Sequence, residues 1–234
     1  MRIQLSRRTS ILVAVALTVV LDFGGAEGQT IPSAYRFVDA GHTTGVIAGV
    51  MQEARGSVGI GPSGGAFFGG RYALEFRGPL AVEATAFVMP TDREVLRPIS
   101  GQGLVPIGTA DMLMMGIDGR LRFSLTGSRT WHGMVPLLMV GGGVVNDFSS
   151  PSELEMDLPV TQRLKFGPSF LVLIGGGVQW IPGERFEFRL DTTLNIWKLD
   201  TPTGFAEVEG EADGLVDEQW TGVGAFILGA TYRF

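Results

Sequence analysis

The sequence lacks cysteine altogether, and this absence excludes several kinds of site. None of its 234 residues is Cys. A disulfide framework, a zinc–thiolate site and a cysteine nucleophile are therefore impossible. Histidine is also scarce, with His42 and His132 as the two in the chain. The formal net charge of −6 leaves no excess of basic residues, which argues against nucleic acid as a partner.

Long apolar runs are also missing beyond the N-terminal region, although hydrophobic residues make up 45% of the chain. A membrane-spanning helix needs about 20 consecutive apolar residues. This apolar content excludes a disordered chain. Glycine is abundant, at 35 residues. An apolar, glycine-rich chain without helical spans favours an all-β protein whose strands face lipid.

The N-terminus has the pattern of a secretory signal. Arg7-Arg8 precedes an almost unbroken apolar run over residues 11–21, and Ala26-Glu27-Gly28 offers a small-x-small cleavage site. We predict a cleavable signal peptide over residues 1–28. An N-terminal anchor helix is the alternative, and the apolar run is short for it.

Segments of alternating apolar residues predict eight antiparallel strands. We place them at residues 43–52, 65–76, 80–90, 112–125, 134–148, 169–181, 186–198 and 221–234. The connections alternate in length. Short turns at 77–79, 126–133 and 182–185 contrast with long loops at 91–111, 149–168 and 199–220. This arrangement is typical of an up-and-down transmembrane β-barrel, whose turns and loops lie at opposite ends.

The facing of side chains is clearest in residues 186–198. Phe188, Leu190 and Leu194 share one face, whereas Arg189 and Asp191 lie on the other. Charges on one face and apolar residues on the other predict a polar interior and a lipid-facing exterior. The two glycine triplets, 141–143 and 175–177, continue strands instead of opening helices. We therefore expect them to allow close approach inside the barrel and not to bind phosphate.

The same alternation predicts a set of charged residues inside the barrel. We expect five basic and five acidic side chains there: Arg71, Arg120, Arg122, Arg189 and Arg233, with Glu75, Glu83, Asp118, Glu187 and Asp191. An eight-stranded barrel is only wide enough for side chains to fill it. Buried charges must be paired. The balanced signs therefore predict a salt-bridged, largely closed lumen.

Aromatic residues near the strand ends predict two interfacial belts. At the turn end they are Trp131, Trp180, Phe186, Tyr232 and Phe234, and at the loop end Phe148, Phe170, Trp197 and Trp220. The last strand finishes Tyr232-Arg233-Phe234. Its aromatic outer positions and final Phe resemble the assembly signal of bacterial outer-membrane β-barrels, with Tyr232 and Phe234 as the signal residues.

The signal with its Ala26-x-Gly28 site, the eight strands, the charged lumen and the terminal Tyr232-Arg233-Phe234 resemble the small OmpA/OmpX/OmpW-type outer-membrane β-barrels. The likeness does not extend to a peptidoglycan-binding domain. It implies a short periplasmic N-terminal segment at 29–42 and a barrel at 43–234. It also implies residence in the bacterial outer membrane, contact with its lipids and lipopolysaccharide, insertion by the barrel assembly machinery, and a monomer.

Three functions are compatible with such a barrel. We favour a structural or surface-interaction protein that is not an enzyme and has no catalytic or cofactor-binding residues. A narrow channel or transporter for small hydrophobic solutes is the alternative. A lipid-modifying enzyme is the third, and it is disfavoured because both histidines fall at the predicted periplasmic end. No metal site is expected; Glu207, Glu209, Glu211 and Asp213 are weak candidates in an acidic loop.

Overall fold

The computed structural model describes residues 34–56, 58–99, 102–205 and 218–234. Strands dominate this part of the chain. They are β1 (Tyr35–Phe37), β2 (Gly41–Met51), β3 (Gly65–Glu75), β4 (Leu80–Ile99), β5 (Gly103–Ser124), β6 (Arg129–Trp131), β7 (Met134–Asp147), β8 (Ser169–Trp180), β9 (Phe186–Asp200) and β10 (Glu218–Arg233). The helical pieces are short: α2 (Glu153–Met156), η1 (Val160–Gln162) and η2 (Thr203–Phe205). None of the described helices is long or apolar enough to cross a membrane.

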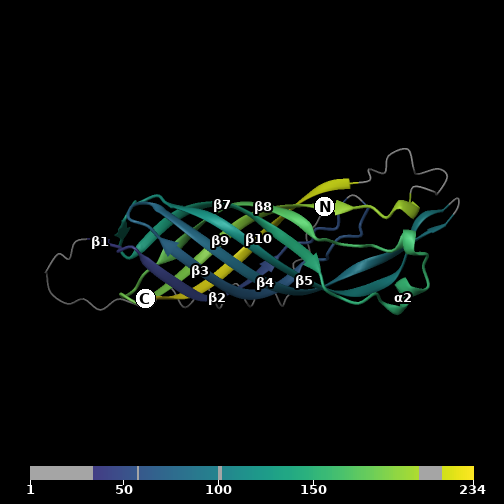
Figure 1. Ribbon diagram of the computed structural model, residues 1–234, viewed down its shortest axis with the longest axis horizontal. Coiled ribbons are helices and arrows are strands. Elements are labelled where there is room, and N and C mark those ends of the chain that lie inside the picture. The colour runs from purple at the N-terminus through teal and green to yellow at the C-terminus, as the bar shows by residue number, and fades with distance from the viewer. Residues whose placement is uncertain (1–33, 57, 100–101, 206–217) are drawn as a thin grey trace, which may run out of the picture. The chain divides into compact units, whose positions relative to one another are not determined.

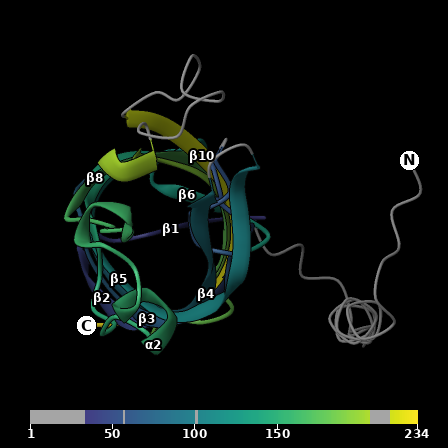
Figure 2. The same ribbon diagram turned by 90° about the vertical axis from the view of Figure 1, so that its right-hand side faces the viewer.

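Eight of the strands form a closed antiparallel ring. They are hydrogen-bonded in the order β2, β3, β4, β5, β7, β8, β9 and β10, and β10 pairs again with β2. The seam runs from Ala225↔Met51 to Arg233↔Thr43. Figure 1 shows the strands side by side, and Figure 2 shows the ring from one end of the barrel. The prediction of an all-β, eight-stranded antiparallel barrel is confirmed.

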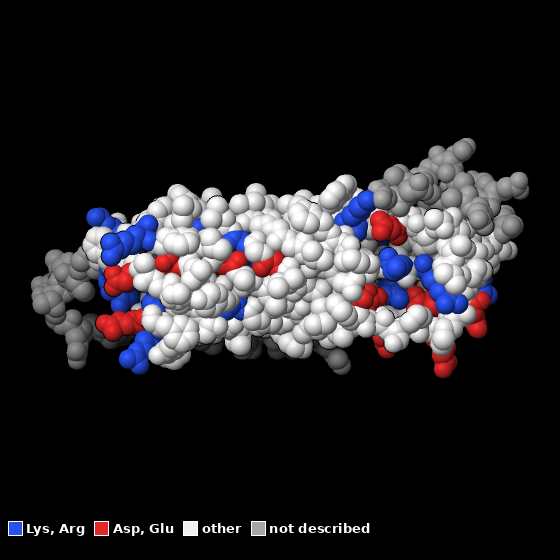
Figure 3. All heavy atoms as spheres, in the orientation of Figure 1, with Lys and Arg blue, Asp and Glu red and all other residues white. Residues whose placement is uncertain are grey.

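The ring forms because each strand alternates between two environments. In β9, outward Phe188 and Leu190 are exposed, whereas Arg189 and Asp191, which alternate with them, are buried. Apolar side chains such as Val46, Leu228 and Ile117 also point outward, where a hydrocarbon solvent stabilises them. In Figure 3 the visible surface between the two ends of the barrel is mostly uncharged.

The expectation of a long loop at residues 91–111 is wrong. β4 continues to Ile99, and β5 already begins at Gly103. The two strands stay paired over this stretch, with one shift of register between Val95 and Leu96. The alternation of apolar and polar side chains ends near Pro90. The backbone hydrogen bonds between the two strands do not depend on that alternation, so the pairing continues. The two strands therefore extend past the ring as a hairpin at the loop end (Figure 1).

The turn end contains two short strands that the sequence pattern did not predict. β1 pairs antiparallel with β6, with Tyr35 opposite Trp131. The stretch 126–133, expected as a short turn, thus contains a strand. β2 begins at Gly41, two residues before the predicted start of the first ring strand. Three residues are too few for alternation to be recognised.

The interior is not polar throughout, which corrects the sequence-based picture. Its loop-side half is an apolar cluster that includes Phe67, Phe87, Met112, Met114 and Leu173. Trp197, expected in the loop-end aromatic belt, belongs to this cluster: it is fully buried and packs edge-on against Phe166, with ring centroids 6.4 Å apart. Its position, one residue after the outward Ile196, places it on the inner face.

Two smaller apolar clusters lie among the connections at the loop end. One joins Ile60, Leu96 and Phe205, and the other joins Val95, Ala110 and Leu158. Residues from four separate connections therefore pack together. We call the region formed by residues 91–99 and 103–111 of β4 and β5, with segments 53–56, 58–64, 149–168 and 201–205, the cap.

Candidate functional site: the closed lumen

The ten charged residues expected in the lumen all point inward in the structure. They come from two opposite walls of the ring: β3, β4 and β5 on one side, β9 and β10 on the other. Eight of the ten are buried, and the side chains of Glu75 and Arg233 remain 8% and 12% exposed. Ion pairs across the lumen join the two walls.

The deeper part of this network centres on Glu83. Its Oε1 lies 2.5 Å from Arg189 Nη1 and 3.1 Å from Arg122 Nη1, while Arg71 Nε is 3.9 Å from its Oε2. Arg71 Nη2 donates to Asp191 Oδ2 at 2.9 Å, and Arg189 Nε donates to Asp191 Oδ1 at 2.6 Å. Three guanidinium groups and two carboxylates thus compensate one another where solvent is excluded.

A second part of the network closes the turn-end mouth. Arg122 pairs with Glu75, whose other oxygen lies 2.5 Å from Arg233 Nη2, and Arg233 also pairs with Glu187. Gln179 connects the two walls. It accepts from Arg122 at 3.2 Å and donates to Glu187 at 2.7 Å. Sequence reasoning missed Gln179, although its inward register in β8 was available.

The pair Asp118–Arg120 stands beside the network and not within it. Arg120 Nε donates to Asp118 Oδ1 at 2.5 Å. Met139 Sδ lies 3.8 Å from Arg120 Nη1 and 3.6 Å from Arg189 Nη2. A polarisable thioether therefore separates this pair from the rest of the lumen charges.

The glycine triplets make room for these side chains. Inward Gly143 is paired with Asp118, and inward Gly177 with Asp191. A Cβ on Gly177 would lie 2.3 Å from Asp191 Oδ1 and 2.4 Å from Leu190 O. Neither triplet opens a helix, so close packing and not phosphate binding accounts for them.

A strap of residues 34–40 crosses the turn-end mouth. At one side the backbone N–H of Val38 donates to Ser128 O at 2.9 Å, and that of His132 donates to Ala34 O at 2.8 Å. At the other side Arg233 Nη1 donates to Asp39 O at 2.7 Å. Because β2, which follows the strap, lies opposite β7 in the ring, the strap spans the whole opening (Figure 2).

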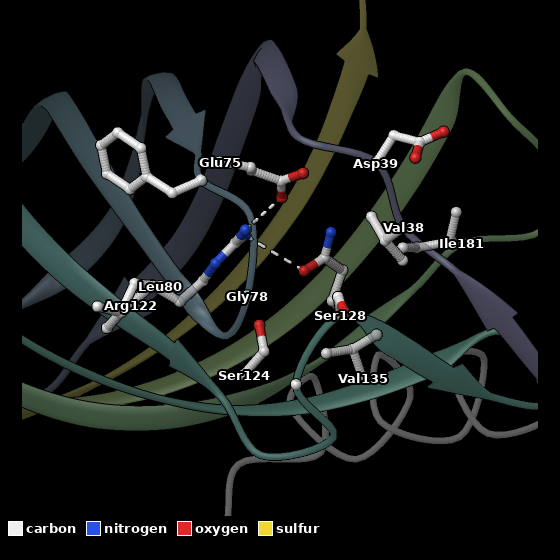
Figure 4. A pocket seen from close by; sticks show the side chains of 13 residues that line it. Val38, Asp39, Glu75, Gly78, Leu80, Arg122, Ser124, Ser128, Val135 and Ile181 are labelled. Atoms are coloured by element: carbon white, nitrogen blue, oxygen red, sulfur yellow. Dashed lines mark hydrogen bonds and ion pairs between the residues drawn. The ribbon is translucent and has the colours of Figure 1, made fainter.

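A small cavity of about 30 Å³ remains between the strap and the network. Figure 4 shows Arg122 reaching Glu75 on one side of it and Val38 and Asp39 of the strap on the other. This volume is about that of one water molecule. A second pocket of about 430 Å³ lies at the same mouth, lined by residues that include Arg36, Glu184 and Arg233.

At the loop-end mouth, an ion-pair latch centred on Arg93 holds part of the cap to the barrel. Arg93, which is buried, donates to Asp147 Oδ2 at 2.5 Å and to Glu155 Oε1 at 2.8 Å. Glu155 belongs to α2, and its carboxylate also accepts from the N–H of Ser152 in a capping box. Arg93 thus fastens the 149–168 connection to the end of β7. Sequence reasoning missed this latch because it placed Arg93 in a loop.

The remaining sequence candidates lie outside the described residues or at the turn end of the last strand. Glu207, Glu209, Glu211 and Asp213 lie outside the described residues, as does the expected signal peptide at 1–28. Within the described ranges, no group of three or more His, Asp or Glu residues could hold a metal ion. The rings of Tyr232 and Phe234 meet edge to face beside the β2–β10 seam, with their centroids 5.4 Å apart.

A closed antiparallel ring with charges inside and apolar residues outside is the inverse of a soluble protein. Its fold is that of a small outer-membrane β-barrel. Such a barrel resides in the bacterial outer membrane, with its short turns in the periplasm and its long connections outside.

Comparison with known proteins finds similar solved structures but no family. No protein-family model matches the chain, and no curated protein matches it. Similar solved structures include OprG from Pseudomonas aeruginosa, at 16% identity and a TM-score of 0.49, covering 83% of this chain and 96% of that one. The N-terminal barrel domain of Pseudomonas aeruginosa OprF has 11% identity and a TM-score of 0.41, with 84% and 100% covered. Ail from Yersinia pestis has 19% identity and a TM-score of 0.37, with 83% and 99% covered. At these identities the likeness concerns the fold alone.

Proposed function

We propose that the protein is a structural and surface-interaction barrel of the outer membrane whose lumen does not conduct. The observation that supports this most is the continuous filling of the lumen. The strap, the ion-pair network and the apolar cluster follow one another from the turn end to the loop end. A side chain–filled barrel of eight strands leaves no aqueous path.

The surface available to an external partner is the cap. Its apolar clusters and the Arg93 latch give the long connections a fixed arrangement. Ordered connections can present side chains to a partner without a large entropic cost of ordering on binding. Catalytic chemistry is not part of this proposal.

Planar-bilayer recordings test the closed lumen. We expect purified wild-type protein to show no steady conductance at either polarity. The double variant Glu75→Ala/Arg233→Ala removes two mouth residues and should raise the frequency of brief openings. The variant Arg97→Ala, which alters an exposed cap residue, is the control. A large, stable conductance in the wild type would contradict the proposal.

One observation favours a second candidate, a carrier for small hydrophobic solutes. The loop-side lumen is lined by apolar residues and holds Met89, Met112 and Met114, whose flexible side chains can adapt to different shapes. Vesicles containing the barrel would then take up an uncharged apolar dye faster than vesicles without it. Equal rates of uptake would leave the closed barrel as the better description.

A further inference from the structure

Every described turn at the periplasmic end carries an exposed arginine next to an exposed aromatic residue. The β3–β4 turn has Phe76-Arg77, the β8–β9 turn has Arg185-Phe186, and the β5–β7 connection has Arg129 two residues before Trp131. The strap repeats the pattern with Arg36-Phe37. We call Arg36, Arg77, Arg129 and Arg185 the arginine collar.

The aromatic partners fix the depth of the collar in the membrane. Phe76, Trp131 and Phe186 are 52%, 50% and 58% exposed on the outer surface. Phe186 also contacts Tyr232, with ring centroids 5.5 Å apart. Aromatic side chains at strand ends mark the level of the lipid headgroups. The collar arginines, at or just beyond this level, are therefore within reach of headgroup phosphates.

Among the described residues, the collar arginines form no ion pairs within the barrel. In the described part of the chain, none of the four is paired with a carboxylate, in contrast to the five arginines of the lumen. Arg36 donates to the backbone oxygen of Ile181 at 2.6 Å, and Arg129 stacks over Phe37 at 4.9 Å. Arg77 and Arg185 have no such side-chain contact.

The acidic residues at this end do not cancel the collar. Glu75 and Glu187 point into the lumen and pair with Arg122 and Arg233. Asp39 in the strap and Glu184 in the β8–β9 turn are exposed, and both line one pocket together with Arg36, while Glu184 also precedes Arg185 in the chain. The stations at Arg77 and Arg129 thus remain locally basic. In Figure 3 basic atoms lie beside acidic atoms at the turn end of the visible face.

We propose that the arginine collar binds the headgroups of anionic phospholipids in the periplasmic leaflet of the outer membrane. Guanidinium groups form paired hydrogen bonds with phosphate oxygens. Basic groups next to an anionic lipid surface increase binding. Arg77, Arg185 and the neighbouring pair Arg36 and Arg129 occupy three places around the rim, where they would hold these lipids and fix the depth and tilt of the barrel. This inference concerns the lipid-facing rim and is independent of whether the lumen conducts.

Brominated lipids test the proposal directly, since bromine quenches nearby tryptophan fluorescence. In a Trp220→Phe background, the exposed tryptophans are Trp131 and Trp180 at the collar, because Trp197 is buried. Detergent-solubilised protein is titrated with brominated phosphatidylglycerol or brominated phosphatidylcholine. We expect phosphatidylglycerol to quench at lower mole fraction, and the difference to shrink in 0.5 M salt.

The variant Arg77→Gln/Arg185→Gln removes two collar residues whose side chains make no hydrogen bond or ion pair with another described residue. We expect its preference for phosphatidylglycerol to fall by about fivefold for each arginine removed. The matched control, Arg97→Gln/Lys165→Gln, removes two exposed cations at the other end and should keep the wild-type preference. Heat-modifiable gel migration verifies that both variants are folded.

Three outcomes would overturn the proposal. The first is equal quenching by the two lipids in the parent protein. The second is an unchanged preference in Arg77→Gln/Arg185→Gln, or an equal loss in the control. The third is that the collar variant keeps its lipid preference but no longer sediments with isolated peptidoglycan, which would make the cell wall the partner.

Discussion

At the residue scale, Glu83 lies near more arginines of the lumen than any other described carboxylate. Arg71, Arg122 and Arg189 all approach its two oxygens. Removing one partner from a buried ion-pair network leaves the other charges uncompensated. The replacement Glu83→Gln preserves the shape of the side chain but removes the charge that three arginines share.

We expect Glu83→Gln to lower the free energy of unfolding by about 3–5 kcal/mol, measured by urea titration of the folded barrel in lipid vesicles. The control Glu94→Gln disrupts the Arg55–Glu94 pair, in which both side chains are more than a third exposed. Such a pair contributes at most about 1 kcal/mol. Similar unfolding midpoints for the two variants would mean that water enters the lumen and screens the network.

Gly177 supports a second prediction at this scale. A methyl group there would overlap Asp191 Oδ1 and Leu190 O, and both atoms are held by strand pairing or ion pairs. Gly177→Ala should therefore destabilise the barrel by about 1–3 kcal/mol in the same urea titration. Gly222→Ala is the control, because a Cβ there would lie 3.6 Å from its nearest neighbour, Leu194 Cδ1. If both alanines are tolerated equally, the close packing beside Asp191 is looser than the distances indicate.

At the element scale, the Arg93 latch holds α2 and the 149–168 connection in place. Arg93→Ala leaves Glu155 buried without its cationic partner, so this connection should open locally. We expect trypsin to cleave after the exposed Lys165 at least about tenfold faster in the variant, while the barrel itself remains intact; tenfold corresponds to about 1.4 kcal/mol of local stability.

Arg97→Ala is the matched control for this digestion. Arg97 is exposed on the same hairpin, and its removal leaves the latch unchanged. Cleavage at the same rate in Arg93→Ala and wild type would show that packing of Leu158 against Val95 and Ala110 is sufficient to hold the connection.

The same elements show what sequence alone could and could not reveal. Alternation identified all eight ring strands because lipid and lumen select opposite residue types at successive positions. The extension of β4 and β5 to Ile99 and Gly103 was missed, since beyond the membrane neither face is selected in this way. The apolar loop-side lumen was missed because both faces of the strands are apolar there. Met112 faces inward and its neighbour Leu113 faces outward.

For the candidate site, the alternation predicted which charged residues face inward but not their partners. Partners across the lumen depend on the stagger of strands that are distant in the ring, as for Arg71 and Asp191, 120 positions apart. The contribution of uncharged Gln179 and of the strap also depends on this three-dimensional arrangement.

At the scale of the whole molecule, the β2–β10 seam closes the ring, and the last residues complete it. The N–H of Phe234 donates to His42 O at 3.0 Å, and its ring makes an edge-to-face contact with Tyr232. We expect Phe234→Ala to reduce the fraction of chain that inserts into membranes, measured by heat-modifiable gel migration. Phe76→Ala, another exposed aromatic at the turn end, is the control. Normal insertion of Phe234→Ala would remove the argument for a terminal assembly signal.

The ion pairs across the lumen also determine how the barrel would respond to mechanical force. Tension applied at Phe234 draws out β10 and then β9, which carry Arg233, Glu187, Arg189 and Asp191. A ring held only by neighbouring strands yields one hairpin at a time. Here, the first hairpin can leave only when its pairs with β3 and β4 break together with the hydrogen bonds to β2 and β8. The highest rupture force therefore belongs to this first step, and the six remaining strands, left with unpaired charges, separate under less tension.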